Sequence, residues 1–381
     1  AGNKTAQGNQ DSNSIGDFYY APPTGYLALC TQNLPEPTVV PSEHFNTVLW
    51  TAQTASSTLT DNGDNTWTVG LDGITSGADL VWTKCRNIGH NNRIFDSVRG
   101  FGETSSLVSN WTGAENGDTD GEVLSASGSS VVINEGNGVN GTYSAGQTYV
   151  GWFWKANGAD VLNENGTIDS QVSANADAGF SIVSWANTGS AVTIGHGLSS
   201  TPELIISKMR SASGSWFIHS KSGAATQILR LEGTYAFGTH DVYNNTYPTS
   251  SVFSYKHGDA EDFIAYCFHS VEGYSKVGSY TGNGSTDGTF VYTGGRPRFV
   301  LLKASSASEH WFIFDSERST YNVTDDFLVP SSSGIEGTGY NLDFESNGFK
   351  LRSTLTEING NGTTYIYYCI FENPFKYTNA R

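Results

Sequence analysis

Short runs of apolar residues alternate with segments rich in Thr, Ser, Asn and Gly along most of the 381-residue chain. Apolar runs that recur about every ten residues between turn-forming residues are typical of strands, and helices would need longer runs with a period of 3.6. No heptad pattern and no long stretch of Ala, Leu, Glu and Lys competes with this pattern. The chain is therefore predicted to be all-β.

Three apolar landmarks occur in one order, at similar spacing, three times along the chain. A segment that recurs with the same landmarks indicates triplication of one unit. The first landmark is apolar at both odd and even positions, which predicts a strand buried on both faces, and the third predicts a central strand. The first lies at 80–84, 204–208 and 299–303, the second at 93–99, 216–221 and 311–318, and the third at 148–154, 262–268 and 364–370.

The expected fold is a tandem repeat of three β-sandwich or jelly-roll-like modules with an extended N-terminal segment. The loops between landmarks differ among the modules, and such loops are where binding specificity normally lies. The predicted parts are an N-terminal linker or docking segment (1–44), module 1 (45–158), a connector (159–178), module 2 (179–274) and module 3 (275–381).

The first 44 residues differ from the rest. Residues 1–14 are polar and typical of a disordered linker, whereas 15–37 contain prolines that favour an extended path against a module or a neighbouring subunit. The chain begins at Ala1, its single methionine is Met209, and no secretion-signal pattern is present. We therefore expect a processed or partial chain with further sequence upstream.

Charge and composition limit the classes of partner that the chain is expected to bind. With 20 basic and 37 acidic residues the net charge is −17, which argues against nucleic acid because phosphate contacts need a basic surface. The chain contains no run of ~18 apolar residues, so no membrane span is predicted. The four cysteines have no paired spacing, so we expect free thiols without disulfides. Cys267 and Cys369 take the place that Phe153 has in module 1, which indicates a core position.

Candidate chemistry is sparse. Asp96 and Asp315 are each followed by Ser and, three residues on, by Arg. The carboxylates could bind a metal or a sugar, or could form a turn and pair with the arginine. Our alignment places His219 at this position in module 2, which weakens the metal hypothesis. The repeated lysines of the first landmark are interpreted as structural, reaching solvent or pairing with a carboxylate.

One loop has oxygen ligands at alternate positions, as at the start of a calcium loop: Asn116, Asp118 and Asp120, with Gly121 at the sixth position. Ser127 stands where the twelfth-position carboxylate is expected, so a plain acidic turn remains the alternative. No other cofactor is predicted. No GxSxG, HExxH or phosphate-loop motif occurs and the histidines are dispersed, so no catalytic residues are predicted.

Aromatic residues in variable loops are the candidate ligand-binding residues, because exposed rings can stack on sugars. Aromatic loop residues can also simply pack against their own module. The candidates are Trp111, Tyr235, Tyr243 and Tyr247.

The chain resembles a family of repeated β-rich modules in tail-fibre or appendage proteins of marine and cyanobacterial tailed phages. In that family such modules typically follow an SPRY- or lectin-like domain. The resemblance covers most of residues 15–374. It is carried by Gly16-Asp17-Phe18-Tyr19-Tyr20-Ala21-Pro22-Pro23-Thr24-Gly25-Tyr26 through Leu34-Pro35-Glu36-Pro37, by Phe95-Asp96-Ser97-Val98-Arg99-Gly100, and by Gln171-Val172-Ser173-Ala174-Asn175 before Gly179-Phe180-Ser181-Ile182-Val183-Ser184.

The resemblance implies an extracellular virion structural protein, a homotrimer near the host-facing end of a fibre. Its implied partners are other virion tail proteins and, through its loops, host surface glycan. It brings no catalytic set, so a non-enzymatic role is expected. Two alternatives remain: a polysaccharide-degrading tailspike-type enzyme on the same scaffold, and a purely architectural appendage.

Overall fold

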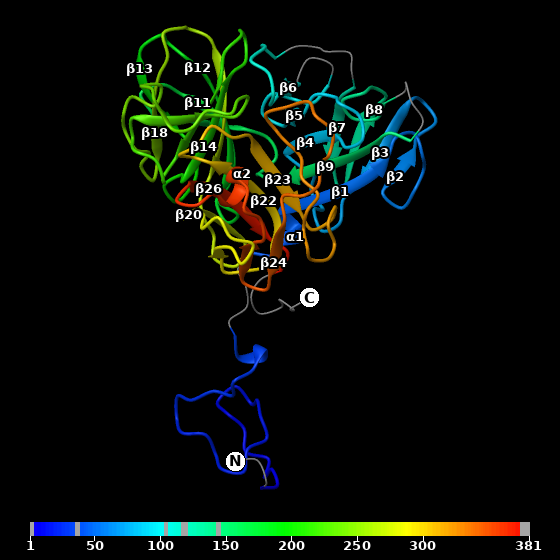
Figure 1. Cartoon of the computed structure of the whole chain (residues 1–381), viewed down its shortest axis with the longest axis vertical. Coiled ribbons are helices and arrows are strands. Elements are labelled where there is room, and N and C mark those ends of the chain that lie inside the picture. Colours follow the sequence, from blue (N-terminus) through cyan, green and yellow to red (C-terminus); the bar gives the residue numbers. More distant parts are fainter. Residues whose placement is uncertain (1–3, 35–38, 103–105, 116–120, 142–145, 374–381) are drawn as a thin grey trace.

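The computed structural model describes residues 4–34, 39–102, 106–115, 121–141 and 146–373. These residues form antiparallel sheets with only short helical turns, which confirms the predicted all-β sandwich class (Figure 1). Within the described part of the chain, no helix is long and apolar enough to cross a bilayer. The helical elements are η1 (Thr31–Asn33), α1 (Pro41–His44) and α2 (Thr356–Asn359).

Module 1 consists of an inner sheet of order β1-β9-β4-β5-β6 and an outer sheet of order β2-β3-β8-β7. A turn joins β2 to β3, with Gly63 and Asn65 at positive φ. The strands are β1 (Phe45–Thr51), β2 (Leu59–Asp61), β3 (Thr66–Gly70), β4 (Leu80–Cys85), β5 (Arg93–Asp96), β6 (Leu107–Val108), β7 (Val123–Ser127), β8 (Ser130–Asn134) and β9 (Thr148–Trp154).

Module 2 has the inner order β12-β19-β14-β15-β16 and a two-stranded outer sheet, β13-β18. The predicted connector is not a bare linker, because it forms a hairpin that extends the inner sheet next to β12. The strands are β10 (Val161–Asn163), β11 (Ser170–Asn175), β12 (Phe180–Ala186), β13 (Ala191–Gly195), β14 (Leu204–Met209), β15 (Trp216–Ser220), β16 (Gln227–Arg230), β17 (Gly238–Thr239), β18 (Val252–Lys256) and β19 (Asp262–Phe268).

Module 3 has the inner order β20-β26-β22-β23 and the outer order β21-β25-β24. Leu328 bridges Ile313 at the edge where modules 1 and 2 carry a fifth strand. The strands are β20 (Ser275–Thr281), β21 (Phe290–Tyr292), β22 (Pro297–Ala304), β23 (Trp311–Asp315), β24 (Leu342–Glu345), β25 (Gly348–Leu351) and β26 (Thr364–Phe371).

One strand order recurs in the three inner sheets. The first landmark forms β4, β14 and β22, whose landmark residues are buried on both faces, and the third forms the central strands β9, β19 and β26, so both predictions are confirmed. The registers correspond as well, since Val81 pairs with Phe153, Ile205 with Cys267 and Val300 with Cys369. The module boundaries and a common origin by triplication remain predictions.

The registers correct one alignment. Leu80 pairs with Asp96 and Phe299 with Asp315, but Leu204 pairs with Ser220. Ser220, not His219, therefore takes the position of the two aspartates, and His219 corresponds to Phe95 and Phe314. A shift of one residue moves a side chain to the opposite face of a sheet, and His219 accordingly lies in the interior of module 2.

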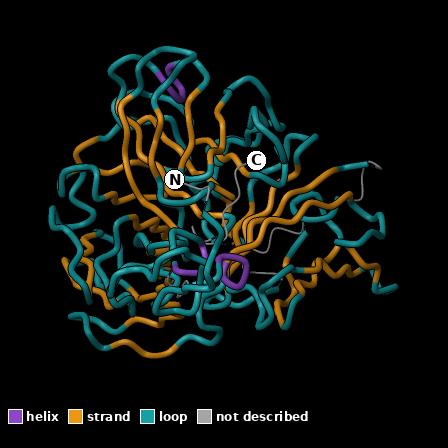
Figure 2. The backbone as a smooth tube through the Cα atoms, turned by 90° about the horizontal axis from the view of Figure 1, so that it is seen from below, coloured by secondary structure: helices purple, strands orange, loops and turns teal. Residues whose placement is uncertain are grey.

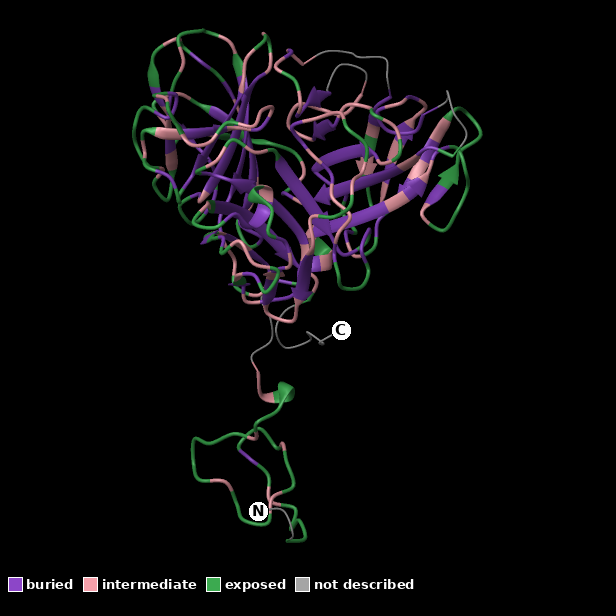
Figure 3. Ribbon diagram, viewed as in Figure 1, coloured by how far each residue is buried: buried purple, intermediate pink, exposed green. Residues whose placement is uncertain are grey.

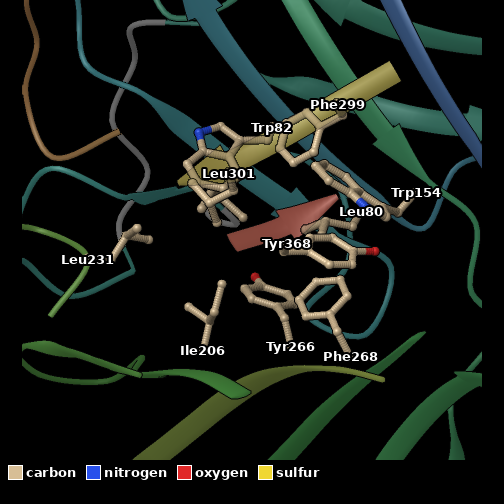
Figure 4. A pocket seen from close by; sticks show the side chains of 11 residues that line it. Leu80, Trp82, Trp154, Ile206, Leu231, Tyr266, Phe268, Phe299, Leu301 and Tyr368 are labelled. Atoms are coloured by element: carbon tan, nitrogen blue, oxygen red, sulfur yellow. The ribbon is translucent and has the colours of Figure 1, made fainter. Parts of the chain in front are cut away.

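The three inner sheets face one another and share a core, while each sandwich has a second core of its own. Seen from below, the strands gather in three groups around the centre (Figure 2). Phe299 of module 3 packs edge-on against Trp152 and Trp154 of module 1, and Phe268 of module 2 meets Tyr368 of module 3. An apolar cavity of about 20 Å³, lined by all three modules, lies at this junction (Figure 4).

Residues 4–34 do not lie against a module of this chain, so contact of the N-terminal segment with a neighbouring subunit stays a prediction. They lie apart from the body and are largely exposed (Figures 1 and 3). The segment is instead organised around the carboxylate of Asp11, which accepts hydrogen bonds from the backbone of Asn13, Ile15 and Ala28 and from the side chain of Asn33. Although desolvation favours the neutral carboxyl group, these donors lower the pKa of Asp11 to about 2.

Candidate functional site

Three equivalent segments, here called straps, cross the boundaries between modules. Each strap follows a leucine that pairs with the second landmark: Leu107 with Ile94, Leu229 with Ile218, and Leu328 with Ile313. From there the chain runs over the neighbouring module. The straps are 108–115 (module 1 onto module 2), 230–237 (module 2 onto module 3) and 329–336 (module 3 onto module 1).

A buried lysine of the neighbouring module anchors each strap at its fifth residue. The ammonium groups donate to backbone carbonyls on both sides of the boundary. The cross-boundary bonds are Lys208 Nζ to Thr112 O (3.2 Å), Lys303 Nζ to Thr234 O (3.2 Å) and Lys84 Nζ to Ser333 O (3.1 Å). The lysine of module 2 thus binds the strap of module 1, that of module 3 binds the strap of module 2, and that of module 1 binds the strap of module 3. These contacts close a ring of three modules.

The lysines are structural, as predicted, but their surroundings are not those expected. All three side chains are buried and do not reach solvent. Their ammonium groups donate hydrogen bonds to carbonyl oxygens and not to carboxylates. Burial lowers the pKa of Lys84, Lys208 and Lys303 to about 8. Each ammonium therefore replaces its water shell with carbonyl groups that would otherwise be buried without donors.

Tryptophans add a second set of bonds across the boundaries. Trp216 donates its indole N–H to the carbonyl of Val108, and Trp311 donates to that of Arg230. At the third boundary, Asn92 takes the equivalent position and donates to the carbonyl of Val329. Since these carbonyls begin the straps, each strap is held at both its first and its fifth residue.

Two boundaries also carry a buried chain of charges. Asp96 pairs with Arg99, and Glu115 at the end of the strap bridges Arg99 (3.2 Å) to Arg210 of module 2 (2.7 Å). Tyr266 of module 2 donates to Asp96 at 2.7 Å. The boundary between modules 3 and 1 repeats the arrangement with Asp315, Arg318, Glu336, Arg86 and Trp152.

Asp96 and Asp315 pair with arginine, as the structural alternative predicted. Each also accepts a hydrogen bond from a neighbouring module, which was not predicted. At the boundary between modules 2 and 3, uncharged residues occupy the four positions that are charged at the other two boundaries. They are Ser220, Gly223, Phe237 and Ser305, and a Cβ atom on Gly223 would lie 2.7 Å from the ring of Phe237. The aromatic ring thus occupies the space that an arginine fills elsewhere.

Trp111 lies immediately before Thr112, the lysine-anchored residue of its strap. Its indole is 47% exposed. One face covers Gly113, where any Cβ atom would collide with the ring. The other face is thus presented on a segment that is fixed by Lys208 and by the backbone bond from Gly214 to Thr112.

Tyr235 lies immediately after Thr234, the anchored residue of the next strap. Its ring is 57% exposed and rests on Gly233, where a Cβ atom would lie 2.7 Å from the ring. The guanidinium of Arg230 lies 5.2 Å from the ring centroid, within the range of a cation–π contact. Trp111 and Tyr235 thus flank equivalent anchored residues at two boundaries, and small residues take both positions in the third strap.

The remaining aromatic candidates differ. Tyr247 is exposed and donates to the carbonyl of Gly223. Tyr243 cannot serve as a binding platform, because only 2% of it is exposed and its hydroxyl bonds Ser207 and the carbonyl of Phe217. Sequence alone could not separate these two tyrosines, since both lie in one polar loop. The structure therefore keeps Trp111, Tyr235 and Tyr247 as candidates and removes Tyr243.

The calcium prediction on Asn116, Asp118 and Asp120 lies outside the described residues. Elsewhere in the described part of the chain, no group of three His, Cys, Asp or Glu side chains could hold a metal ion. The possible calcium site thus stays a prediction.

Comparison with known proteins gives a family and no activity. A family model described as a domain of unknown function, DUF7483, matches residues 40–374. The chain belongs to the DUF7483 family. No curated protein and no solved structure matches it. The family match spans all three modules and both aromatic straps, and it begins after the Asp11-centred segment.

Proposed function

We propose that this DUF7483 chain is a non-enzymatic structural segment of a virion tail fibre or appendage that binds host surface glycan. One observation carries the glycan part of the proposal: Trp111 and Tyr235 present exposed ring faces beside the anchored residues of two straps. Exposed aromatic rings on fixed backbone stack on sugars at little entropic cost. The virion location and the homotrimer rest on the sequence resemblance.

The non-enzymatic part is supported by the structural roles of the repeated lysines and aspartates. The buried lysines bind carbonyls, and the repeated aspartates bind arginine and the neighbouring module. These groups hold three sandwiches in a closed ring. A rigid body with exposed aromatics at its boundaries suits an adhesin, which must present a surface under load.

The proposal is tested by a glycan array with the purified chain, together with its mass in solution, with and without calcium. We expect retention of intact glycan, and a loss of at least about tenfold in affinity for Trp111→Ala/Tyr235→Ala. Tyr321→Ala is the matched control, because Tyr321 is also exposed but lies on no strap. Equal binding by both variants contradicts the strap proposal, and a blank array for the wild-type chain contradicts glycan recognition altogether.

A polysaccharide-degrading enzyme is the second candidate, and one observation favours it. Burial and the nearby Glu357 raise the pKa of Glu309, and Tyr340 donates to Glu357 at 3.1 Å. A carboxyl group with a raised pKa near a second carboxyl group is one feature of glycosidase sites. Release of reducing ends from polysaccharide, abolished in both Glu309→Gln and Glu357→Gln, would establish this function.

A further inference from the structure

Module 3 carries a second aromatic surface, on β21, an edge strand of its outer sheet. Phe290 and Tyr292 are 44% and 66% exposed, while Val291 between them is buried. Alternate residues of a strand lie on one face about 7 Å apart. Two rings are thus displayed side by side, and Phe290 lies over Gly348 of the neighbouring strand, whose Cβ would be 3.0 Å from the ring.

The strand ends at a real depression. A cavity of about 460 Å³ lies between the end of β21 and the turn 270–276, which links module 2 to module 3. This volume is within the range of small-ligand sites. Its walls combine apolar and polar groups: Val271, Glu272, Lys276, Tyr292, Thr293 and Phe371.

Two charged side chains that line this cavity have no partner among the described residues. No hydrogen bond or ion pair is found for the carboxylate of Glu272 or the ammonium of Lys276 within the described residues. Most other lysines and arginines of the described chain bind a carboxylate or a carbonyl oxygen. One carboxylate and one ammonium that line the same cavity offer hydrogen bonds of both kinds with no net charge.

The backbone around the cavity is fixed. The turn is closed by bonds from Val271 N to Ser275 O and from Tyr274 N to Val271 O, and Phe371 N binds Tyr274 O. On the other wall, the N–H groups of Thr293 and Gly294 both bind Asn347 O. The site therefore exists before any ligand arrives, which reduces the entropic cost of binding.

We propose that the platform of Phe290 and Tyr292 and the adjoining cavity form a binding site for a neutral glycan chain. The rings would stack on successive sugar faces, and Glu272 and Lys276 would bind hydroxyl groups of a terminal sugar. An apolar protein partner would bury both charges without partners, at a high desolvation cost. A polyanionic glycan would meet the Glu272 carboxylate. The ligand class rests on the proposed function, but the site is separate from the straps.

The test is affinity electrophoresis of the full chain in native gels containing laminarin, galactomannan or xyloglucan, all soluble neutral polysaccharides. We expect retardation of the wild-type chain in at least one gel, weakened about tenfold in Phe290→Thr/Tyr292→Thr. Threonine keeps a high strand propensity, so β21 should persist, and thermal unfolding verifies it. Tyr321→Thr removes another exposed ring of module 3 and should migrate like the wild-type chain.

Each outcome decides the inference. Weaker retardation of Phe290→Thr/Tyr292→Thr, with Tyr321→Thr unchanged, supports it. Retardation lost only in Trp111→Ala/Tyr235→Ala overturns it and leaves the proposed function standing. A wild-type chain that runs unretarded in all three gels also overturns it, whereas the proposed function fails only if the glycan array is blank too. Unchanged retardation of Glu272→Gln/Lys276→Met removes the cavity from the site.

Discussion

The ammonium of Lys208 lies 3.2 Å from the carbonyl oxygen of Thr112, across the boundary between two modules. Equivalent bonds occur at the other two boundaries, so a lysine buried in one module binds the strap of the preceding module around the ring. The closure buries one apolar cluster to which the inner sheets of all three modules contribute. The lysines and the straps are therefore where the stability of the ring can be tested.

The first prediction concerns alkaline pH. The lysine pKa falls from 10.5 in the unfolded chain to about 8 in the fold, so the unfolded chain binds more protons between these values. The free energy of unfolding should therefore rise with pH above 8, by about 1 kcal/mol per pH unit for each lysine. Chemical denaturation at pH 8.0, 8.5 and 9.0 measures this slope.

The window must end near pH 9. Burial raises the thiol pKa of Cys267 and Cys369 above the ordinary value of 9.0, so these groups reduce stability at higher pH. In Lys208→Met the slope should fall by about 1 kcal/mol per pH unit, because one of three equivalent groups is gone. An unchanged slope would mean that Lys208 is not a buried cation.

The second prediction concerns the charged and the uncharged sets of residues found at equivalent positions of the module boundaries. Glu336→Phe alone should lower the free energy of unfolding by about 3 kcal/mol, because it leaves the buried Arg318 and the half-buried Arg86 without a shared carboxylate. Introducing the complete uncharged set should recover at least half of this loss, since a ring then fills the space of the arginine. The complete variant is Asp315→Ser, Arg318→Gly, Glu336→Phe and Arg86→Ser.

Urea denaturation of the single and the quadruple variant gives the comparison. Leu355→Ala, at an exposed site away from the straps, is the control for a surface change and should be neutral. If the quadruple variant is no more stable than the single one, the four positions do not act as a unit.

The sequence predicted the strands of the inner sheets well, because residues 80–84, 204–208 and 299–303 are apolar at both odd and even positions. It could not predict the closure of the ring, which depends on contacts between residues far apart in the chain. Lysine is normally exposed, so Lys84, Lys208 and Lys303 gave no sign of burial. Phe290, Val291 and Tyr292 are all apolar, so nothing in their order showed which would face solvent.

The third prediction concerns the N-terminal segment. Deleting residues 1–38 should change the melting temperature of the body by less than about 2 °C, because residues 4–34 make no hydrogen bond or ion pair with described residues of the body. Scanning calorimetry measures the shift. Deleting through residue 45 is the contrasting variant, because it also removes the buried Val39, Pro41 and Phe45 and should lower the melting temperature clearly. A large shift for the shorter deletion would mean that the segment packs on the body.

The last prediction concerns His219, which stands where modules 1 and 3 have Phe95 and Phe314. Its ring is buried between Tyr243 and Tyr247, and neither ring nitrogen has a hydrogen-bond partner within the described residues. Burial lowers its pKa from 6.5 to about 4. The unfolded chain thus binds more protons between pH 4 and 6.5, and stability falls as the pH drops through this range.

His219→Phe should therefore stabilise the protein by about 1 kcal/mol at pH 7, because it removes two buried polar atoms without partners. It should also reduce the loss of stability between pH 6.5 and 4, by about 1 kcal/mol per pH unit. Denaturation at pH 4.5, 5.5 and 6.5 gives both values. Leu355→Ala, which changes an exposed side chain without a titratable group, should leave this slope intact. A destabilised His219→Phe variant would show that the tyrosine rings leave no room for a phenyl group, and an unchanged slope would show that His219 does not titrate on unfolding.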